Sequence, residues 1–555
     1  MRRPWVLGML LFFAALPLFS QDETLRFERA TQRIDELVRR EMAEDRTPGM
    51  AIAITSRDGL LRLSSYGFAN RDNHQPVTEE TLFGIGSIGK SFTAVATLEL
   101  HDEGKLDFHA PLETYLPWFK VRSTVPITAH HLLTHTAGLP NMRMELRSSL
   151  YQVFWLTHAP VTFEPGTQYH YSSAAFDGLS TLIEAQSHET YGEFIQKRIF
   201  DPLEMNHSEP VFKHKMRPRL AISYEPLYDD RPANPCDPLV ESNWYEYGGG
   251  AGSIAATVGD LATYVRMLLN RGAGPHQRII SEASFQLLTQ HAVVRGRNHY
   301  YGYGLDITEE DGHTVIGHGG GVQGFHSMIL GDLTDGVGVA VLANGGLHAD
   351  LAPYVLNAAK AALHNHDLPA LPSADSPDQI PNASEYVGTY SAPDGKKLDL
   401  RAEQNRLILL HDGQAIALLK KGPDRFLCSH PDLSLFYLQF GRERGAVTEA
   451  SYGPQWYVNE RYTGPREFPY PTKWNAYPGH YRTSTRHQIN FRIVVRKGEL
   501  WMVGSSGDES PLVASPNGTF QVGKTPEWVS FADELNGKTL RVNYSGTDFE
   551  RDFTP

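Results

Sequence analysis

The chain changes character at a proline-rich stretch that falls late in its 555 residues. Between Leu368 and Pro381, prolines recur among Ala, Ser and Asp, a composition typical of a linker. Helical and extended patterns alternate before this stretch, whereas only short alternating strands follow it. A chain of this length is also too long for one core, since single domains stop growing near about 250 to 300 residues. The sequence therefore predicts several domains joined by a linker at residues 368–382.

The region before the linker combines helices with an antiparallel sheet. Apolar residues at helical spacing predict an amphipathic helix over 27–43, and two β-prone runs around a turn predict a hairpin over 50–68. Further helices are expected at 174–186, 190–199, 259–269 and 351–364, and further strands at 314–316, 327–330 and 337–342. Thr257 and Asp260 are placed to form a capping box. We expect residues 21–367 to be an α+β domain in which helices flank a largely antiparallel sheet.

The region after the linker contains a duplication. The segment Tyr386-Val387-Gly388-Thr389-Tyr390 recurs as Tyr477-Pro478-Gly479-His480-Tyr481, and similar alternating strands follow each copy. Closure into a barrel would remove the exposed edges of such strands. We therefore predict two small antiparallel β-barrel domains, at residues 383–465 and 472–555.

Residues 83–92, FGIGSIGKSF, fit two incompatible active sites. The glycines with Lys90 and Ser91 match the phosphate loop G-x-x-x-x-G-K-[ST], while Ser87 and Lys90 match S-x-x-K. A phosphate loop needs a buried hydrophobic strand before it, yet residues 71–80 are mostly polar. In the other interpretation both side chains share one helix face, so a lysine with a depressed pKa can take the serine proton. The sequence favours the serine nucleophile.

Other segments accompany this pair in a recognisable order. They are Phe163 to Gly166 followed by Tyr169 to Ser173, Gly317 to Gly321 (GHGGG), Leu132 to Pro140 (LLTHTAGLP), Gly248 to Ser253 followed by Asp260-Leu261, and Tyr301 to Gly304 (YGYG). With these motifs, about residues 27 to 364 resemble the serine β-lactamase and penicillin-binding-protein superfamily. The resemblance is to its class C, D-aminopeptidase and esterase branch.

The resemblance implies a site and a mechanism. Ser87 would be acylated, Lys90 would accept its proton, and Tyr171 would relay protons to and from the leaving group and water. The backbone amides of Ser87 and Gly321 would form an oxyanion hole for the tetrahedral intermediate. Neither a metal nor a cofactor is implied.

Two positions depart from the family pattern. Ser173 stands where the family commonly has the asparagine of Tyr-x-Asn, so a shorter hydroxyl replaces an amide. His318-Gly319-Gly320 stands where β-lactamases have Lys-Thr-Gly, and histidine is mostly neutral at pH 7. The histidine variant resembles the esterases and the D-stereospecific aminopeptidases, and the latter also carry two barrels after the catalytic domain. We expect Ser173, His318, Gly320 and Gly321 to bind substrate or the oxyanion.

The expected reaction is hydrolysis of an amide or ester, in a D-amino-acid peptide, a peptidoglycan-type peptide or a carboxylic ester. Two alternatives stay open: a β-lactamase or DD-carboxypeptidase, and a non-catalytic binding or scaffold protein that retains the fold. The duplicated Tyr-x-Gly-x-Tyr segments further suggest that a barrel loop reaches the catalytic mouth and restricts access to it.

The first residues and the net charge bear on location and partners. Arg2 and Arg3 precede an apolar run from Trp5 to Phe19 that is shorter than the roughly 20 residues of a membrane span. Ser20 is a plausible cleavage point, so we expect residues 1–20 to be an export signal and the protein to be periplasmic or secreted. The net charge of −13 disfavours nucleic acid or an anionic membrane face as a partner. The resemblance implies a small-molecule or peptide substrate instead.

The cysteines and two histidines carry weaker signals. Cys236 and Cys428 form no metal-ligand or redox motif, and we expect two separate buried thiols. His131 and His135 are spaced for a metal on one helix face, but no glutamate accompanies them, so we expect packing residues.

Overall fold

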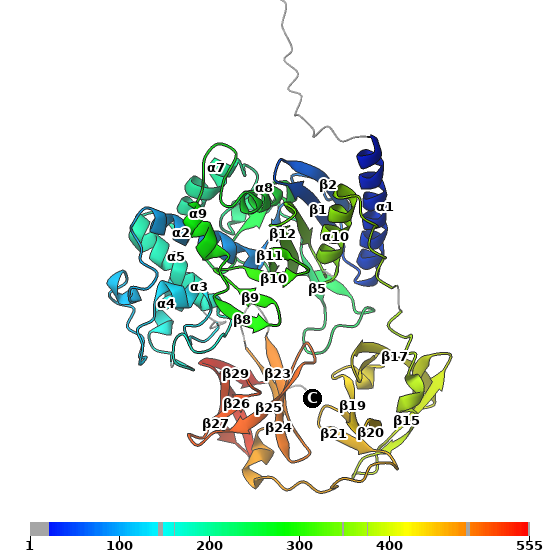
Figure 1. Ribbon diagram of the computed structural model, residues 1–555. Coiled ribbons are helices and arrows are strands. Elements are labelled where there is room, and N and C mark those ends of the chain that lie inside the picture. Colours follow the sequence, from blue (N-terminus) through cyan, green and yellow to red (C-terminus); the bar gives the residue numbers. More distant parts are fainter. Residues whose placement is uncertain are drawn as a thin grey trace, which may run out of the picture.

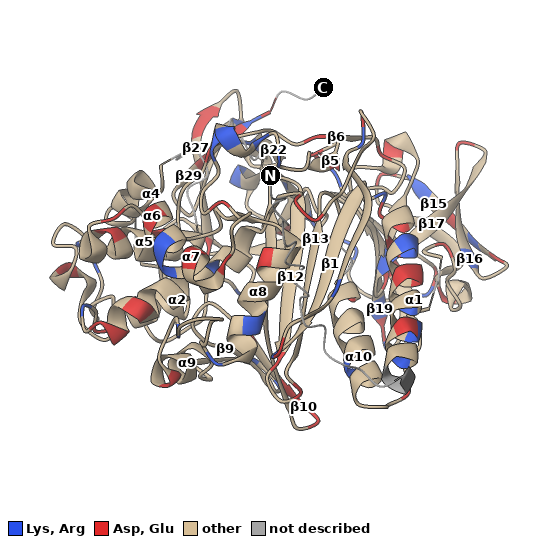
Figure 2. Ribbon diagram, turned by 90° about the horizontal axis from the view of Figure 1, so that it is seen from above, with Lys and Arg blue, Asp and Glu red and all other residues tan. Residues whose placement is uncertain are grey.

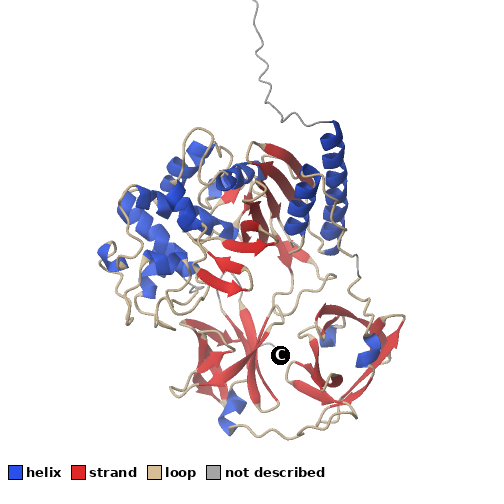
Figure 3. Cartoon of the chain, in the orientation of Figure 1, coloured by secondary structure: helices blue, strands red, loops and turns tan. Residues whose placement is uncertain are grey.

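The computed structural model describes residues 21–141, 148–159, 161–346, 349–373, 376–483 and 489–552. The expected export signal, residues 1–20, lies outside the described residues. Three units follow one another along the chain (Figure 1). We call them the N-terminal region (residues 21–364), barrel 1 (388–458) and barrel 2 (479–551). Figure 3 shows that the long helices all belong to the N-terminal region, while both barrels consist largely of strands.

The N-terminal region is built on one nine-stranded sheet. Its spatial order is β3 (Gln75–Pro76), β2 (Leu60–Asn70), β1 (Gly49–Ser56), β13 (Val337–Ala343), β12 (Phe325–Asp332), β11 (His313–Val322), β10 (Asp306–Glu310), β9 (His299–Tyr301) and β8 (Val293–Gly296). The neighbouring strands pair antiparallel, and β1 pairs with β13 from Met50↔Ala343 to Ser56↔Val337. The first and last parts of this region therefore meet at the centre of the sheet, which confirms the antiparallel prediction.

Helices cover both faces of this sheet. They are α1 (Gln21–Glu44), α2 (Gly89–Asp102), α3 (Ala129–Leu133), α4 (Ser149–Leu156), α5 (Ser173–Ser187), α6 (Tyr191–Ile195), α7 (Asp201–Leu203), α8 (Val258–Leu269), α9 (Glu282–Leu288) and α10 (Leu351–Leu363). Seen from above, β12, β13 and β1 lie between α8 on one side and α10 with α1 on the other (Figure 2). The neighbouring inner strands β1 and β13 contain no charged residue, which suits strands that are buried on both faces.

A short two-stranded ladder holds the segment that leads into α2. In it β4 (Phe83–Gly84) pairs with β7 (Ala255–Ala256), and the next residue, Ile85, donates its backbone N–H to the carbonyl of Ile254 at 3.0 Å. The 3₁₀ turn η1 (Gly86–Ile88) follows immediately and runs into α2. Ser87 thus lies just ahead of the helix.

The two barrels are closed and repeat one design. Barrel 1 contains β14 (Gly388–Ser391), β15 (Lys397–Glu403), β16 (Arg406–His411), β17 (Gln414–Gly422), β18 (Arg425–Cys428), β19 (Leu438–Glu443), β20 (Ala446–Tyr452) and β21 (Gln455–Val458). Barrel 2 contains β22 (Gly479–Arg482), β23 (Asn490–Arg496), β24 (Glu499–Gly504), β25 (Glu509–Ala514), β26 (Phe520–Val522), β27 (Trp528–Leu535), β28 (Lys538–Tyr544) and β29 (Thr547–Arg551). The Tyr390 hydroxyl donates to the carbonyl of Tyr386 at 3.0 Å, and Tyr481 repeats this bond to Tyr477 at 2.6 Å. The duplicated motif therefore has the same structural role in both copies.

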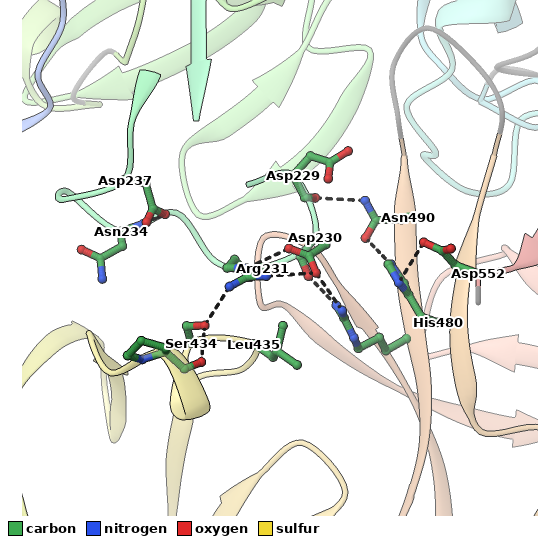
Figure 4. A network of polar contacts seen from close by, with 12 residues as sticks. Asp229, Asp230, Arg231, Asn234, Asp237, Ser434, Leu435, His480, Asn490 and Asp552 are labelled. Carbon is green, nitrogen blue, oxygen red and sulfur yellow. Dashed lines mark hydrogen bonds and ion pairs between the residues drawn. The ribbon is translucent and has the colours of Figure 1, made fainter. Parts of the chain in front are cut away.

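An arm of the N-terminal region, residues 227–238, joins both barrels. It extends from the hairpin of β5 (Tyr224–Pro226) and β6 (Leu239–Glu241). Within the arm, Asp229 accepts two hydrogen bonds from Arg482 of barrel 2 at 2.7 and 3.2 Å, and Asp230 pairs with Arg492 at 3.0 Å. Arg231 donates to Ser434, on the barrel 1 side, at 3.0 Å (Figure 4). The arm is thus fixed by charge-assisted bonds on both sides.

Two local predictions need correction. The Thr257 side chain accepts the backbone N–H of Asp260 at 3.2 Å, but the reciprocal half of the capping box is missing. The Asp260 carboxylate instead accepts from the backbone of His207 and the hydroxyl of Ser208, because this loop packs beside the helix. Of the two free cysteines only Cys428 is buried, since Cys236 lies in the exposed arm. Among the described residues, none of the helices has the length and apolar character that crossing a membrane requires.

Candidate active site

Ser87 and Lys90 form the centre of the site. The Lys90 ammonium nitrogen, Nζ, lies 3.0 Å from Ser87 Oγ and 2.7 Å from the carbonyl oxygen of Ala251. Lys90 is 0% exposed, and burial lowers its pKa from 10.5 to about 7, an effect that the charge of Asp177 partly offsets. A substantial fraction of Lys90 is therefore neutral at pH 7 and able to accept a proton.

Tyr171 lies against the same pair of side chains. Its ring centroid is 4.9 Å from Lys90 Nζ, and its hydroxyl forms a hydrogen bond with Ser87. Burial raises the pKa of Tyr171, and the bond to Ser87 offsets only part of that rise. The phenol consequently keeps its proton at neutral pH and is placed to donate it.

The glycines of β11 let this strand approach the turn that carries Ser87. A Cβ atom on Gly320 would stand 1.9 Å from the carbonyl oxygen of Ile85, and one on Gly86 would stand 2.6 Å from the backbone nitrogen of Gly321. Gly86 also has φ +49°, a conformation that glycine adopts without strain. Only glycines at these positions allow the backbones around Ser87 and Gly321 to lie side by side.

The two positions that depart from the family pattern have different surroundings. Ser173 is the first residue of α5, and its backbone N–H donates to Asn141 Oδ1 at 2.8 Å. His318 is buried, with its ring 6.3 Å from that of Tyr171. Among the described residues, no hydrogen bond joins the side chain of Ser173 or of His318 to Ser87 or Lys90.

A directional chain of hydrogen bonds fixes His318. The backbone N–H of Ser172 donates to His135 Nδ1 at 3.0 Å, so the proton of this neutral histidine is on Nε2, which is 3.2 Å from the Tyr301 hydroxyl. Tyr301 in turn lies 3.3 Å from His318 Nε2, and His318 Nδ1 lies 2.6 Å from the carbonyl of Gly319. Burial lowers the pKa of both histidines, to about 4 for His318. Both nitrogens of His318 are therefore occupied.

Asp177 is, after the His135–Tyr301–His318 chain, a second feature of the site that the sequence did not predict. Its carboxylate is 1% exposed and accepts from the Tyr247 hydroxyl at 3.1 Å and from the Ala251 backbone at 3.3 Å. Burial raises its pKa to about 6. The only signal in the sequence was an acidic residue inside the apolar run of α5, whereas His135 and Tyr301 both lie within the segments on which the resemblance rests.

Barrel 2 contacts the segment that carries Tyr171. Glu527 Oε1 lies 2.6 Å from Nε2 of His170, the residue before Tyr171, and both side chains are largely buried. A Cβ atom on Gly546 of the same barrel would stand 2.7 Å from the ring of Trp155 in α4. Barrel 2 therefore packs directly against the part of the N-terminal region that frames the site.

Two groups of described residues could hold a metal ion, and neither includes a predicted site residue. They are His411 with His430 and Asp432 in barrel 1, and His313 with Asp332 and Asp335 in the N-terminal region. In the second group the Lys360 ammonium already pairs with both carboxylates, at 3.3 Å from Asp335.

Residues 34–362 match the family model described as Beta-lactamase, which is more than half of the chain. The chain belongs to the Beta-lactamase family. It is accordingly a member of the serine β-lactamase and penicillin-binding-protein superfamily, whose members are serine hydrolases. The two closed barrels come after the β-lactamase-like domain in the chain.

Two relatives of this Beta-lactamase family member are penicillin-binding proteins by name. Penicillin-binding protein 4* of Bacillus subtilis (strain 168) is 26% identical over 391 residues, which is 66% of this chain and 84% of the relative. Penicillin-binding protein 4 of Amycolatopsis lactamdurans is 26% identical over 372 residues, 63% of this chain and 95% of the relative. The structure of an octameric penicillin-binding protein homologue from Pyrococcus abyssi matches with a TM-score of 0.57 and 24% identity, over 77% of this chain and all of that chain.

Proposed function

We propose that the protein is a serine hydrolase that forms an acyl-enzyme on Ser87. The observation that supports this most directly is the buried Lys90, whose Nζ lies 3.0 Å from Ser87 Oγ and whose pKa is lowered to about 7. An ordinary lysine is neutral in only about one molecule in 3,000 at pH 7. The buried lysine is neutral in about half, so burial makes it a base of useful strength.

In the first half of the reaction the Ser87 proton moves to Lys90 Nζ as Oγ attacks the substrate carbonyl carbon. The negative charge on the carbonyl oxygen is stabilised by the backbone N–H groups of Ser87 and Gly321. The tetrahedral intermediate then collapses, and the bond to the leaving group breaks. Tyr171, which keeps its phenol proton, donates it to the leaving group and takes the proton from the Lys90 ammonium.

In the second half a water molecule takes the place of the leaving group. It loses a proton to the same Lys90 and Tyr171 pair while its oxygen attacks the acyl carbon. Collapse of this second intermediate releases the acid and returns the proton to Ser87 Oγ. Each proton taken up in one half is given back in the other, so the cycle needs neither metal nor cofactor.

We propose amide or ester substrates, such as D-amino-acid peptides, peptidoglycan-type peptides or carboxylic esters. His318 occupies the place of a cationic lysine but is neutral, and both of its nitrogens bond to protein groups. We assign His318 to holding β11 in position, and Ser173, Gly320 and Gly321 to the substrate side of the site. With the apolar run of residues 1–20 as an export signal, the reaction takes place outside the cytoplasm.

Labelling with a fluorophosphonate tests this proposal. The wild-type protein should gain one phosphonyl group on Ser87, located by mass spectrometry of peptides, and should turn over members of an ester and D-peptide panel. Ser87→Ala should lose both, whereas Ser91→Ala should keep both, because Ser91 Oγ bonds to the carbonyl of Ile88 and the hydroxyl of Tyr264, which are structural partners. Absence of both the adduct and turnover in folded wild-type protein would refute the proposal that the protein is a serine hydrolase.

A further inference from the structure

Lys90 is held by groups from several elements. Ser87 contacts it from η1, Tyr171 from the segment before α5, and the Ala251 carbonyl from the loop of residues 247–252. His135 and His318 also face it but are held neutral by burial. Among the described residues, the carboxylate of Asp177 in α5 is the negative charge that raises the pKa of Lys90.

Asp177 also holds the loop that binds Lys90. Its carboxylate accepts the N–H of Ala251, and the carbonyl of this same residue accepts from Lys90 Nζ. The Tyr247 hydroxyl fixes the carboxylate from the start of the loop. Packing is tight here, since a Cβ atom on Gly249 would stand 2.5 Å from Asp177 Oδ1. Asp177 and Lys90 are thus connected through one peptide unit.

The position of Asp177 on α5 is informative. It lies one helical turn after Ser173, on the same face of the helix. Ser173 is the position at which the side chain is too short to replace the missing amide. The polar group of α5 that acts on Lys90 is therefore the carboxylate of Asp177, one helical turn after Ser173.

We propose that Asp177 is the positioning residue of Lys90. It fixes the loop whose Ala251 carbonyl orients the amine, and its negative charge stabilises the ammonium that forms when Ser87 gives up its proton. This inference rests on the proposed function, because it concerns the same proton transfer.

Asp177→Asn separates the charge from the geometry. An asparagine can still accept from Tyr247 and Ala251 through its Oδ1, but it carries no charge. Lys90 must be neutral to act, so activity is lost as the pH falls through its pKa. Removing the carboxylate lowers that pKa further, and the acid limb of kcat/KM should move to lower pH by about one unit. The maximal rate should fall at the same time.

The measurement is the rate of Ser87 phosphonylation and of ester turnover across about pH 5 to 9. Titration of the Lys90 resonance in protein containing carbon-13-labelled lysine, assigned with Lys90→Met, reports the same shift without turnover. Asp260→Asn is the matched control, since Asp260 is a buried carboxylate of the same region that bonds instead to His207 and Ser208. It should leave the acid limb in place.

Tyr247→Phe provides a second test that keeps the carboxylate. Loss of the hydroxyl donor raises the pKa of Asp177, so this group becomes neutral at a higher pH and the acid limb should move in the same direction by a smaller amount. A folded, active Asp177→Asn protein with an unmoved acid limb and an unmoved Lys90 titration would overturn the inference. Failure of wild-type protein to react at Ser87 would instead overturn the proposed function, and the Lys90 titration would still decide the role of Asp177.

Discussion

Replacing Lys90 with methionine is expected to abolish the reaction at Ser87 and to stabilise the N-terminal region at pH 7. Lys90 is fully buried, and burial lowers its pKa from 10.5 to about 7. In the unfolded chain the same lysine is a solvated cation, so the unfolded state binds more protons at pH 7 than the folded state does. Lys90 therefore lowers the stability of the folded state at every pH below its unfolded pKa.

The size of the effect follows from the two pKa values. At ~1.4 kcal/mol per pKa unit, the shift corresponds to roughly 4 kcal/mol at pH 7. Methionine has a similar length but loses the hydrogen bonds to Ser87 and Ala251, each worth about 1 kcal/mol. The expected net gain is about 2 kcal/mol at pH 7 and falls to zero near about pH 9. At pH 10 the variant should be less stable by about 1 kcal/mol, because the penalty for burying Lys90 is then small while the lost hydrogen bonds remain.

Thermal unfolding followed by circular dichroism at the two pH values measures this gain. At about 2 °C per kcal/mol, Lys90→Met should raise Tm by about 4 °C at pH 7. Lys360→Met is a matched control that should lower Tm, because it removes the ammonium that pairs with the buried Asp332 carboxylate. An unchanged Tm at pH 7, or a gain of equal size at pH 10, would refute the reasoning that burial of the amine sets its pKa.

Three further predictions concern the surroundings of the site. Gly320→Ala should lower kcat about 100-fold, because its Cβ would stand 1.9 Å from a backbone carbonyl oxygen. Gly319→Ala is the control and should have a mild effect, because its Cβ would meet only the end of a methionine side chain at 3.3 Å. Steady-state kinetics of the two variants tests this difference. Tyr301→Phe breaks the directional chain between two histidines and should lower kcat/KM about tenfold with little change in Tm; an unchanged kcat/KM would remove this chain from the mechanism. Glu527→Ala frees His170 from barrel 2, and relative kcat/KM for bulky over small esters should rise severalfold; an unchanged ratio would show that this contact does not restrict access.

Most of the fold could be predicted from local patterns. Periodicity placed the longest helices and the strands β1, β2, β11, β12 and β13 of the sheet, but not short elements such as α3, α9 and β8. The repeated Tyr-x-Gly-x-Tyr segment indicated two related barrels that the structure confirms as closed. The arm at residues 227–238 could not be predicted. Its sequence is that of an ordinary loop, and its partners Arg482 and Arg492 lie more than 250 positions later, so no local pattern connects them. The exact domain limits stay predictions.

The site could be predicted only as far as motifs extend. Ser87, Lys90 and Tyr171 each belong to a segment of fixed spacing, and the structure brings them together. His135 lies in such a segment too, but its spacing to His131 gave no hint that a strand tyrosine would be its partner. Asp177 carries no motif at all. Its importance follows from burial beside a lysine, which is a property of the folded chain alone, and the roles of these residues stay proposals.

The arm also constrains the order in which the molecule is completed. Asp229 and Asp230 are made early during synthesis, yet the arginines that pair with them belong to strands 253 and 262 residues later. The N-terminal region can fold as soon as it leaves the ribosome, while Asp229 and Asp230 of the arm still lack their arginine partners from barrel 2. We therefore expect docking of barrel 2 to be a late and slow step of folding, because contacts of such large sequence separation form slowly. A chain that stops before barrel 2 would expose this acidic arm at its surface. Proteases could then cleave the arm in the incomplete chain more readily than in the complete one.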